Sequence, residues 1–236
     1  MNEPTTLSRW KSLAVEGLVI VASILLAFAI DAWWDQKREI RDAQDQTARV
    51  VAELRANINL LQGQDENLGQ STEAARQLLR LMGPDVEPIS TEEVGSLVFR
   101  LFGQRTLSLS TSATQNFLSS GQLTEGPWID VRLSLAALES RVQVVENNSL
   151  ELRELRPALV DVMSNAVSGL DVVREHPVMA EYAPSRFKSD PVALMADMKF
   201  ESLVSTYSIR MELNRTSIQE LLDLHVAVVA MIEREN

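Results

Sequence analysis

The 236-residue chain contains no cysteine and only two histidines, His176 and His225. Without cysteine it can form no disulfide framework, no cysteine-based zinc site, no iron–sulfur cluster and no thiol nucleophile. The histidines lie 49 positions apart, so the sequence holds no local histidine pair for a metal ion. We therefore expect neither a cofactor nor a metal site.

Positive charge is also scarce. Lys and Arg number 22 against 33 Asp and Glu, which gives a formal net charge of −11. Proteins that bind nucleic acids contact the phosphate backbone with clustered Lys and Arg, so we expect no nucleic-acid partner. The lack of cysteine suits an oxidising compartment.

Local catalytic motifs are missing as well. The sequence has no Gly-x-Ser-x-Gly elbow for a serine nucleophile and no glycine-rich loop for phosphate binding. We expect a non-enzymatic protein, although carboxylates that meet only in the folded chain remain an alternative.

The longest uncharged run is GLVIVASILLAFAI, residues 17–30. Apolar flanks extend it to residues 12–34, and Trp10 precedes it while Trp33 and Trp34 close it. Trp10 and Trp33 are separated by about 35 Å on a helix that rises 1.5 Å per residue. This matches a hydrocarbon core of about 30 Å with aromatic residues at both interfaces. The segment predicts a transmembrane helix over residues 12–34, with the lipid bilayer as its partner.

Two other interpretations compete with an anchor. A secretory signal would use Arg9 and Lys11 as its basic region and the Ala-Phe-Ala of residues 27–29 as its cleavage site. Glu16 and the tryptophans beyond that site favour an uncleaved anchor. A buried core helix is the third interpretation.

Orientation does not follow from charge, because basic residues flank both ends of the span. The leader, residues 1–11, is too short to be a domain. We therefore expect the leader in the cytoplasm and the bulk of the chain exported.

Polar and small residues within the span are candidate functional positions. Glu16 and Asp31 lie 15 residues apart, on nearly one helix face, with Ser23 and Ala27 between them. Carboxylates inside a membrane are costly and often functional. Their separation of about 22 Å along a helix puts each near an interface, which favours a structural or topological role over a proton or partner role. Ser23 and Ala27 would allow close helix approach and oligomerisation.

Heptad spacing follows the span and predicts a stalk helix over residues 35–82. The first seam steps by four and three residues, as in a packed helix face. Its positions are Thr47, Val51, Leu54, Ile58, Leu61, Asp65, Leu68, Thr72, Ala75, Leu79 and Met82. The seam is weakest at Asp65, where we expect a kink, and Gly83 ends the helix.

A second seam occupies the carboxyl-terminal end. Its positions are Phe200, Val204, Tyr207, Met211, Asn214, Ile218, Leu221, His225, Val228 and Ile232. Asp190 and Pro191 supply a cap and a first-turn proline, which predicts a helix over residues 191–234 with a bend near Lys199. Such coiled-coil seams are used within a bundle or between subunits, and both remain open.

Asn214 and His225 interrupt this second seam. They predict either register control or a pH-sensitive contact through His225, or else polar groups satisfied inside a bundle or turned partly to solvent. The second interpretation is favoured, since single polar seam residues often serve only specificity.

Shorter helices fill the region between the seams. Ser90 opens a helix through a capping box, and Gly103 closes it. Ser110 or Thr111 caps another, which ends at Gly121. The Ser, Thr and Gln residues here fit helix caps and a loop better than a site for a small polar ligand.

Proline marks the remaining boundaries. Pro157 either starts a new helix or kinks an existing one, and residues 176–191 form a surface loop. The predicted fold is all-α: the transmembrane helix continues into the stalk and packs with the carboxyl-terminal helix in an elongated bundle. Residues 83–236 form the bundle domain.

The anchor follows a recognisable pattern. Its matching positions are Glu16, Ala27, Ile30 and Trp33. Its departures are Val15 and Ser23 in place of glycines, and Asp31-Ala32 in place of an asparagine pair. The pattern resembles an uncharacterised family of bacterial proteins with one amino-terminal membrane helix and a helical domain of unknown function.

Two further phrases are similar to that family. Residues 112–121 form a Ser-led short helix that ends in Ser-Gly, and residues 53–58 resemble the family's stalk. The resemblance covers about a quarter of the chain and implies a membrane-anchored helical architecture in a bacterial protein. With the bulk of the chain exported, we expect a single-pass protein of the bacterial inner membrane with a periplasmic helical domain. The resemblance brings no catalytic residue.

The expected function is non-enzymatic. The exported helical domain would mediate assembly, scaffolding or partner binding, with a homo-oligomer or another membrane protein as partner. The alternatives are a ligand-sensing module or an accessory subunit of a larger membrane complex, including an ion-driven complex that uses Asp31.

Overall fold

The computed structural model describes residues 6–103, 107–121, 123–174, 179, 182–183 and 185–235. The side chains of residues 6–15 and 20 lie outside the described part. The chain divides into unit 1, Met1–Arg49, and unit 2, Val50–Asn236.

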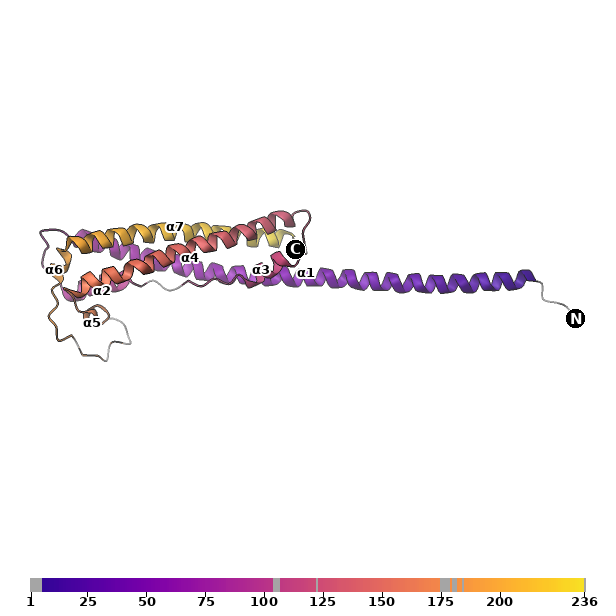
Figure 1. Ribbon diagram of the computed structural model, residues 1–236, viewed down its shortest axis with the longest axis horizontal. Coiled ribbons are helices and arrows are strands. Elements are labelled where there is room, and N and C mark those ends of the chain that lie inside the picture. The colour runs from indigo at the N-terminus through magenta and orange to yellow at the C-terminus, as the bar shows by residue number, and fades with distance from the viewer. Residues whose placement is uncertain are drawn as a thin grey trace. The chain divides into compact units, whose positions relative to one another are not determined.

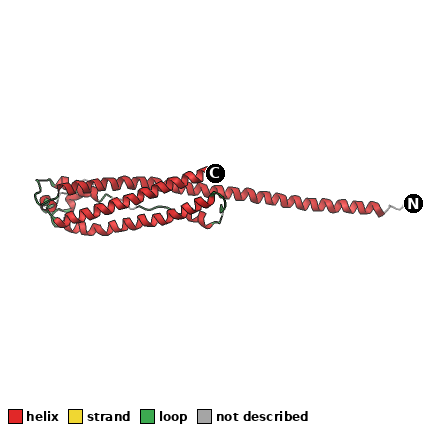
Figure 2. Ribbon diagram, turned by 90° about the horizontal axis from the view of Figure 1, so that it is seen from above, coloured by secondary structure: helices red, strands yellow, loops and turns green. Residues whose placement is uncertain are grey.

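Helices account for 81% of the chain, and the described residues contain no strand, which confirms the all-α prediction (Figure 2). The helices are α1 (Thr6–Leu81), α2 (Thr91–Leu101), α3 (Ser112–Ser119), α4 (Trp128–Ser164), α5 (Gly169–Val172), α6 (Pro191–Met195) and α7 (Met198–Glu235).

Unit 2 is a bundle in which the long amino-terminal and carboxyl-terminal helices pack together, as predicted. Arg55 of α1 pairs with Glu233, and Arg76 pairs with Glu212, so α1 and α7 run antiparallel. Helix α4 lies beside α7, also antiparallel, and Arg141 Nη1 is 3.1 Å from Glu220 Oε2. It follows that α1 and α4 run parallel (Figure 1).

The connection between two parallel helices must return along the bundle. Helix α2 lies near one end of unit 2, and α3 lies near the other (Figure 1). Residues 107–111 between them are non-helical, with Leu107 and Leu109 half-buried against the core. This crossover takes the place that a fourth long helix would have in a four-helix bundle.

The second heptad seam forms the inner face of α7. All ten of its positions are buried, including Tyr207, Met211, Ile218 and Leu221. The core that covers them comes from the chain itself.

The predicted seam of α1 consists of two columns of positions, each repeating every seven residues, and the structure differs from the prediction in one of these columns. Leu54 and Leu61 are buried as core positions, whereas Val51 and Ile58 are only half-buried. The second buried column falls one residue earlier, at Val50, Asn57, Gln64, Ser71 and Leu78. Three of these five side chains are polar, so an apolar pattern could not reveal them.

Helix boundaries correct three further expectations. Asp65 accepts hydrogen bonds from Arg215 and Gln219, both at 2.9 Å, and α1 continues past it without a break. Pro157 lies inside α4 and starts no new helix. The predicted helix over residues 191–234 is divided into α6 and α7.

Asp197 explains that division. Its Oδ1 atom accepts hydrogen bonds from the backbone N–H groups of Lys199 at 2.7 Å and Phe200 at 2.9 Å. An aspartate that binds the first free N–H groups of a helix is a strong start signal. A new helix therefore begins here, where the sequence predicted a bend near Lys199.

The compact unit begins within the predicted stalk helix. Unit 2 begins at Val50, so residues 50–81 of the predicted stalk belong to the bundle and supply part of its core. The segment between the tryptophan pair and unit 2 is residues 35–49.

Helices α2 and α5 approach closely at Gly95. A Cβ atom added there would lie 3.0 Å from the Asp171 carbonyl oxygen and 3.4 Å from Val172 Cα. Contacts this short involve backbone, which cannot move aside cheaply.

Gly95→Ala should therefore lower the free energy of unfolding by about 1 kcal/mol, because overpacking outweighs the gain in helix propensity. Gly63→Ala is the matched control, since no atom lies within 4 Å of its added Cβ. It should raise stability by up to about 1 kcal/mol. Thermal denaturation followed by circular dichroism measures both, and equal shifts of the same sign would refute the packing explanation.

Candidate functional site

The apolar segment of α1 is the first candidate site. It belongs to a helix long and apolar enough to cross a membrane, and none of its apolar window is buried within the protein. Its large apolar side chains are strongly exposed, including Leu18 at 71%, Leu25 at 62% and Phe28 at 66%. A core helix would bury such residues, so the interpretation as a buried core helix is disfavoured.

The predicted anchor residues lie on this helix. Glu16 and Asp31 are exposed and lie 15 residues apart, with Ala27, also exposed, between them. The Ser23 hydroxyl donates to the Val19 carbonyl at 2.8 Å, so its proton is already hydrogen-bonded within the helix. Trp10 lies in the helical part of α1, but its side chain is outside the described residues.

The tryptophan pair marks the end of the apolar segment. The rings of Trp33 and Trp34 meet edge to face with centroids 5.4 Å apart. Lys37 Nζ lies 4.5 Å from the Trp33 ring centroid, within range of a cation–π contact. Aromatic rings beside a cation are typical of the headgroup level of a membrane.

Glu53 forms the densest polar site in unit 2. Its carboxylate accepts the backbone N–H of Ala113 at 2.8 Å and that of Thr114 at 2.9 Å. It also accepts the hydroxyls of Ser110 at 2.8 Å, Ser112 at 3.2 Å and Thr114 at 2.9 Å. The first turn of α3 is thus capped by a side chain from another helix.

The cap changes the expected role of Thr111. Thr111 occupies the N-cap position of α3, but its side chain makes no capping hydrogen bond, and neither does that of Ser110. Burial raises the pKa of Glu53, but the hydrogen bonds to Ala113 and Thr114 outweigh burial and lower it overall. Glu53 is therefore held as a carboxylate, whose charge suits a helix N-terminus.

Asn57 fixes the crossover one turn further along α1. Its Nδ2 group donates to the Ser110 carbonyl at 2.7 Å, and its Oδ1 atom accepts the Ser110 N–H at 3.0 Å. Both backbone groups of one crossover residue are thus satisfied by a single buried side chain, as they would be by a neighbouring strand.

Asn214 lies inside the bundle, with little of its surface exposed. Its Nδ2 group donates to the Ser149 hydroxyl at 3.3 Å, and Ser149 donates to the Val145 carbonyl at 2.8 Å. The Asn214 Oδ1 atom has no hydrogen-bond partner within the described part of the chain. An asparagine in this setting fits register control between α4 and α7.

His225 is also buried, and its Nδ1 atom is 2.8 Å from the Leu221 carbonyl. This distance assigns the Nδ1 proton to that hydrogen bond. Burial lowers the pKa of His225, opposed by the Leu221 hydrogen bond and by the charge of Glu53. The folded protein therefore holds His225 in its neutral form.

Stability should consequently fall on mild acidification. The unfolded state takes up a proton near pH 6.5, whereas folded His225 resists it to a lower pH. The contribution of neutral His225 is complete above about pH 6.5 and is lost as the pH falls from there toward the folded pKa. Thermal denaturation of the wild type and His225→Gln at about pH 7.5 and about pH 5.5 tests this: the variant should lose less stability between the two. An identical loss in both proteins would contradict it.

Open clefts surround the first turn of α2. One of about 540 Å³ has both basic and acidic residues in its lining, among them Arg80, Arg100, Glu92 and Glu93. A second, of about 670 Å³, includes Arg174. Nearly all the lining side chains are exposed or half-buried, and their charges are mixed, so these clefts have few features of a preformed small-molecule site.

The described residues contain no cluster of three His, Asp or Glu side chains that could hold a metal ion. Residues 112–121 form α3 and its exit, where Gly121 has φ of +67°, in the left-handed region that favours glycine. His176 and Arg105 lie outside the described residues.

The sequence patterns did not identify Glu53 and Asn57 as the polar side chains that hold the start of α3 and the crossover. The only signal was the polar run at residues 110–114, which indicated a cap without indicating its partner.

No known protein family, curated protein or solved structure matches the chain.

Proposed function

We propose that the chain is a non-enzymatic, single-pass protein of the bacterial inner membrane, with unit 2 in the periplasm. Unit 2 would mediate assembly, scaffolding or partner binding at the membrane. The observation that carries the anchor is the strong exposure of the apolar side chains of residues 16–34, ended by Trp33 and Trp34.

The scaffold role is supported by how unit 2 is built. Its three long helices share one apolar core, and ion pairs fix α7 to both neighbours. A rigid bundle attached to an anchor suits a protein that positions partners. The buried α7 seam serves this core, so a homo-oligomer or a complex with another membrane protein would form through other surfaces.

Topology tests the proposal, and the absence of cysteine makes the test simple. Ser8→Cys in the leader and Ser140→Cys on the exposed side of α4 each introduce the single thiol of the chain. A membrane-impermeant maleimide added to intact spheroplasts should label Ser140→Cys but not Ser8→Cys. Labelling of Ser8→Cys alone would reverse the orientation, and labelling of both in intact spheroplasts would exclude a single span.

Assembly is tested separately by native mass spectrometry of the full-length protein extracted gently from membranes. A defined homo-oligomer or a stoichiometric complex with another protein supports the scaffold role. A monomer without any partner would count against it.

Ligand sensing is the alternative, favoured only by the cleft whose lining includes Arg80, Arg100, Glu92 and Glu93. Side chains of both charges would suit a small zwitterion. A thermal shift of the full-length protein with amino acids that is abolished by Arg80→Ala and Arg100→Ala together would favour this alternative.

A further inference from the structure

An aromatic side chain projects from the connection between α5 and α6. Phe187 is 84% exposed, more than any other large apolar side chain among the described residues, including those of the apolar segment of α1. Met198, at the start of α7, is 77% exposed, and Tyr182 is 60% exposed. Single exposed apolar side chains are common on protein surfaces, so the charges beside Phe187 decide what it can bind.

Phe187 is held close to a fixed point of the bundle. Ser189, two residues later, donates from its hydroxyl to Asp171 Oδ2 at 2.6 Å. The N–H of Asp190 donates to the Ala166 carbonyl at 2.8 Å. The exposure of Phe187 is therefore built into the structure beside two long-range hydrogen bonds.

Phe187 has a basic residue before it and another after it in the sequence. Arg186 and Lys188 are exposed, and neither has an ion pair within the described part of the chain. Asp190 and Asp197 accept N–H groups at the starts of α6 and α7, and Asp171 accepts the Ser189 hydroxyl. Arg186, Phe187 and Lys188 together are called the distal tip.

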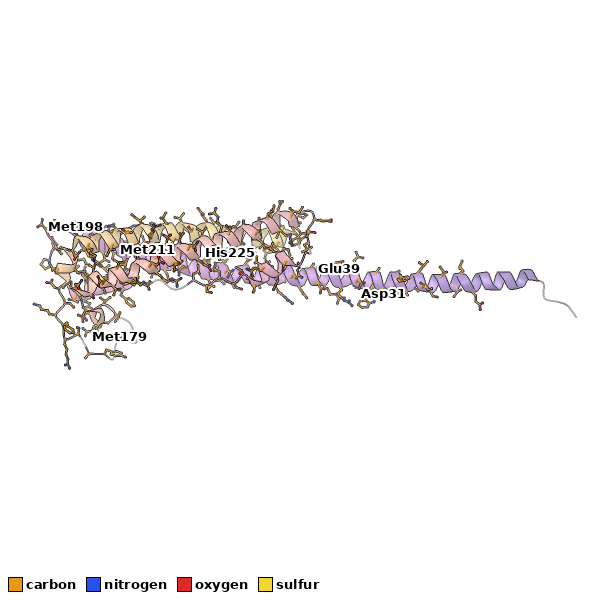
Figure 3. All side chains as sticks on the ribbon, in the orientation of Figure 1. Asp31, Glu39, Met179, Met198, Met211 and His225 are labelled. Carbon is orange, nitrogen blue, oxygen red and sulfur yellow. The ribbon has the colours of Figure 1, made fainter. Side chains whose placement is uncertain are left out.

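The distal tip lies far from the place where the chain enters unit 2. Figure 1 shows α5 and α6 at the end of unit 2 opposite the carboxyl terminus. Figure 3 places Met198 and Met179 at this same end. The carboxyl-terminal end of α7 lies beside Arg55, near the start of unit 2. The part of α1 from Val50 to Leu81 separates the two ends by about 47 Å.

The rest of unit 2 is acidic. Unit 1 holds six of the 22 basic and seven of the 33 acidic residues, so unit 2 carries 16 basic and 26 acidic residues, a net charge of −10. The sides of the bundle would therefore be repelled by an anionic surface, whereas the distal tip would be attracted to it.

We propose that the distal tip binds an anionic phospholipid bilayer. Phe187 inserts at the headgroup level, and Arg186 and Lys188 bind lipid phosphates. The repulsion of the acidic sides makes this contact end-on. This lipid contact is independent of the proposed anchor.

A lipid surface fits the distal tip better than a protein groove does. A protein partner normally buries a contiguous patch of about 800 Å² on each side. The distal tip instead offers one exposed aromatic residue with a basic residue on each side in the sequence, a composition that suits the interface of an anionic membrane.

The test uses full-length protein in nanodiscs of phosphatidylcholine and measures its recruitment to separate, larger vesicles by flotation. Loading into the nanodiscs reports on the anchor, and recruitment to the vesicles reports on the distal tip, so the two proposals fail independently. Vesicles that contain phosphatidylglycerol should recruit the protein, and vesicles of phosphatidylcholine alone should not.

Variants identify the residues responsible. Phe187→Ser should weaken recruitment by about tenfold, and Arg186→Gln with Lys188→Gln should weaken it by roughly fivefold for each cation removed. Leu133→Ser is the control, because Leu133 is 64% exposed on α4, away from the distal tip, and this change should leave recruitment unaltered. Circular dichroism verifies that each variant is folded.

Three results would overturn the proposal. One is equal recruitment to neutral and anionic vesicles. Another is an equal loss in Leu133→Ser and Phe187→Ser. The third is stoichiometric binding of an acidic protein that requires the distal tip, without recruitment of the tip to anionic vesicles.

Discussion

Replacing Leu25 and Leu26 together with arginine should move the protein from the membrane fraction to the soluble fraction. Both side chains are 62% exposed and lie in the middle of the apolar segment. A Leu-to-Arg change at the centre of a span costs about 3 kcal/mol, so the pair costs about 6 kcal/mol. Alkaline extraction of membranes followed by immunoblotting measures the redistribution.

The control places the same charges elsewhere on the surface. Leu133→Arg with Leu213→Arg changes two leucines of unit 2 that are 64% and 52% exposed. This variant should stay in the membrane fraction. If the Leu25 and Leu26 variant also resists extraction, the apolar segment is not what holds the protein in the membrane.

Glu53→Ala should lower the free energy of unfolding by about 2 kcal/mol, a value that allows for partial exposure of the carboxylate. The change removes the acceptor for two backbone N–H groups at the start of α3, together with three hydroxyls. The expected fall in Tm is about 6 °C for a unit of this size. Thermal denaturation by circular dichroism in nanodiscs measures it.

This effect should depend on pH in a defined direction. The pKa of Glu53 is lowered in the folded protein, so its contribution is complete above the ordinary value of 4.5. The contribution is lost as the pH falls from there through the folded pKa. The difference in stability between the wild type and Glu53→Ala should therefore narrow as the pH falls below about 4.5.

Glu66→Ala is the matched control for Glu53→Ala. Glu66 is an exposed glutamate of the same helix, and its removal should change stability by less than about 0.5 kcal/mol. Equal effects of the two substitutions would show that the cap of α3 contributes little.

Apolar periodicity predicted the parts of the fold that apolar contacts build. The inner face of α7 could be predicted because a step of four and three residues marks a packed face, and Asn214 and His225 also lie on this face. The same reasoning placed Leu54 and Leu61 in the core of α1.

Buried polar side chains account for most of the structure that could not be predicted from the sequence. The buried column of α1 contains Asn57, Gln64 and Ser71, which an apolar pattern passes over in favour of Val51 and Ile58. Asn57 is buried because it pairs with a crossover residue 53 positions away. No local pattern encodes that partner.

The same limit applies to the candidate sites. The anchor is a local property, so its length and aromatic ends could be read from the sequence. The cap of α3 by Glu53 and the fixed position of Phe187 depend on contacts between distant segments. A run of polar residues in the sequence shows that hydrogen-bond partners are needed, whereas only the fold identifies those partners.

The antiparallel packing of α1 and α7 also determines how unit 2 would respond to mechanical force. A pull between Val50 and the α6 end runs along the helix axes and loads α1 against its neighbours in shear. The ion pairs of Arg55 and Arg76 and the buried columns between them would then resist together. A pull between Val50 and Glu235 acts at one end of the bundle and would separate α7 from α1 one turn at a time. Unit 2 should therefore be mechanically strong along its length and weak when its two chain ends are drawn apart.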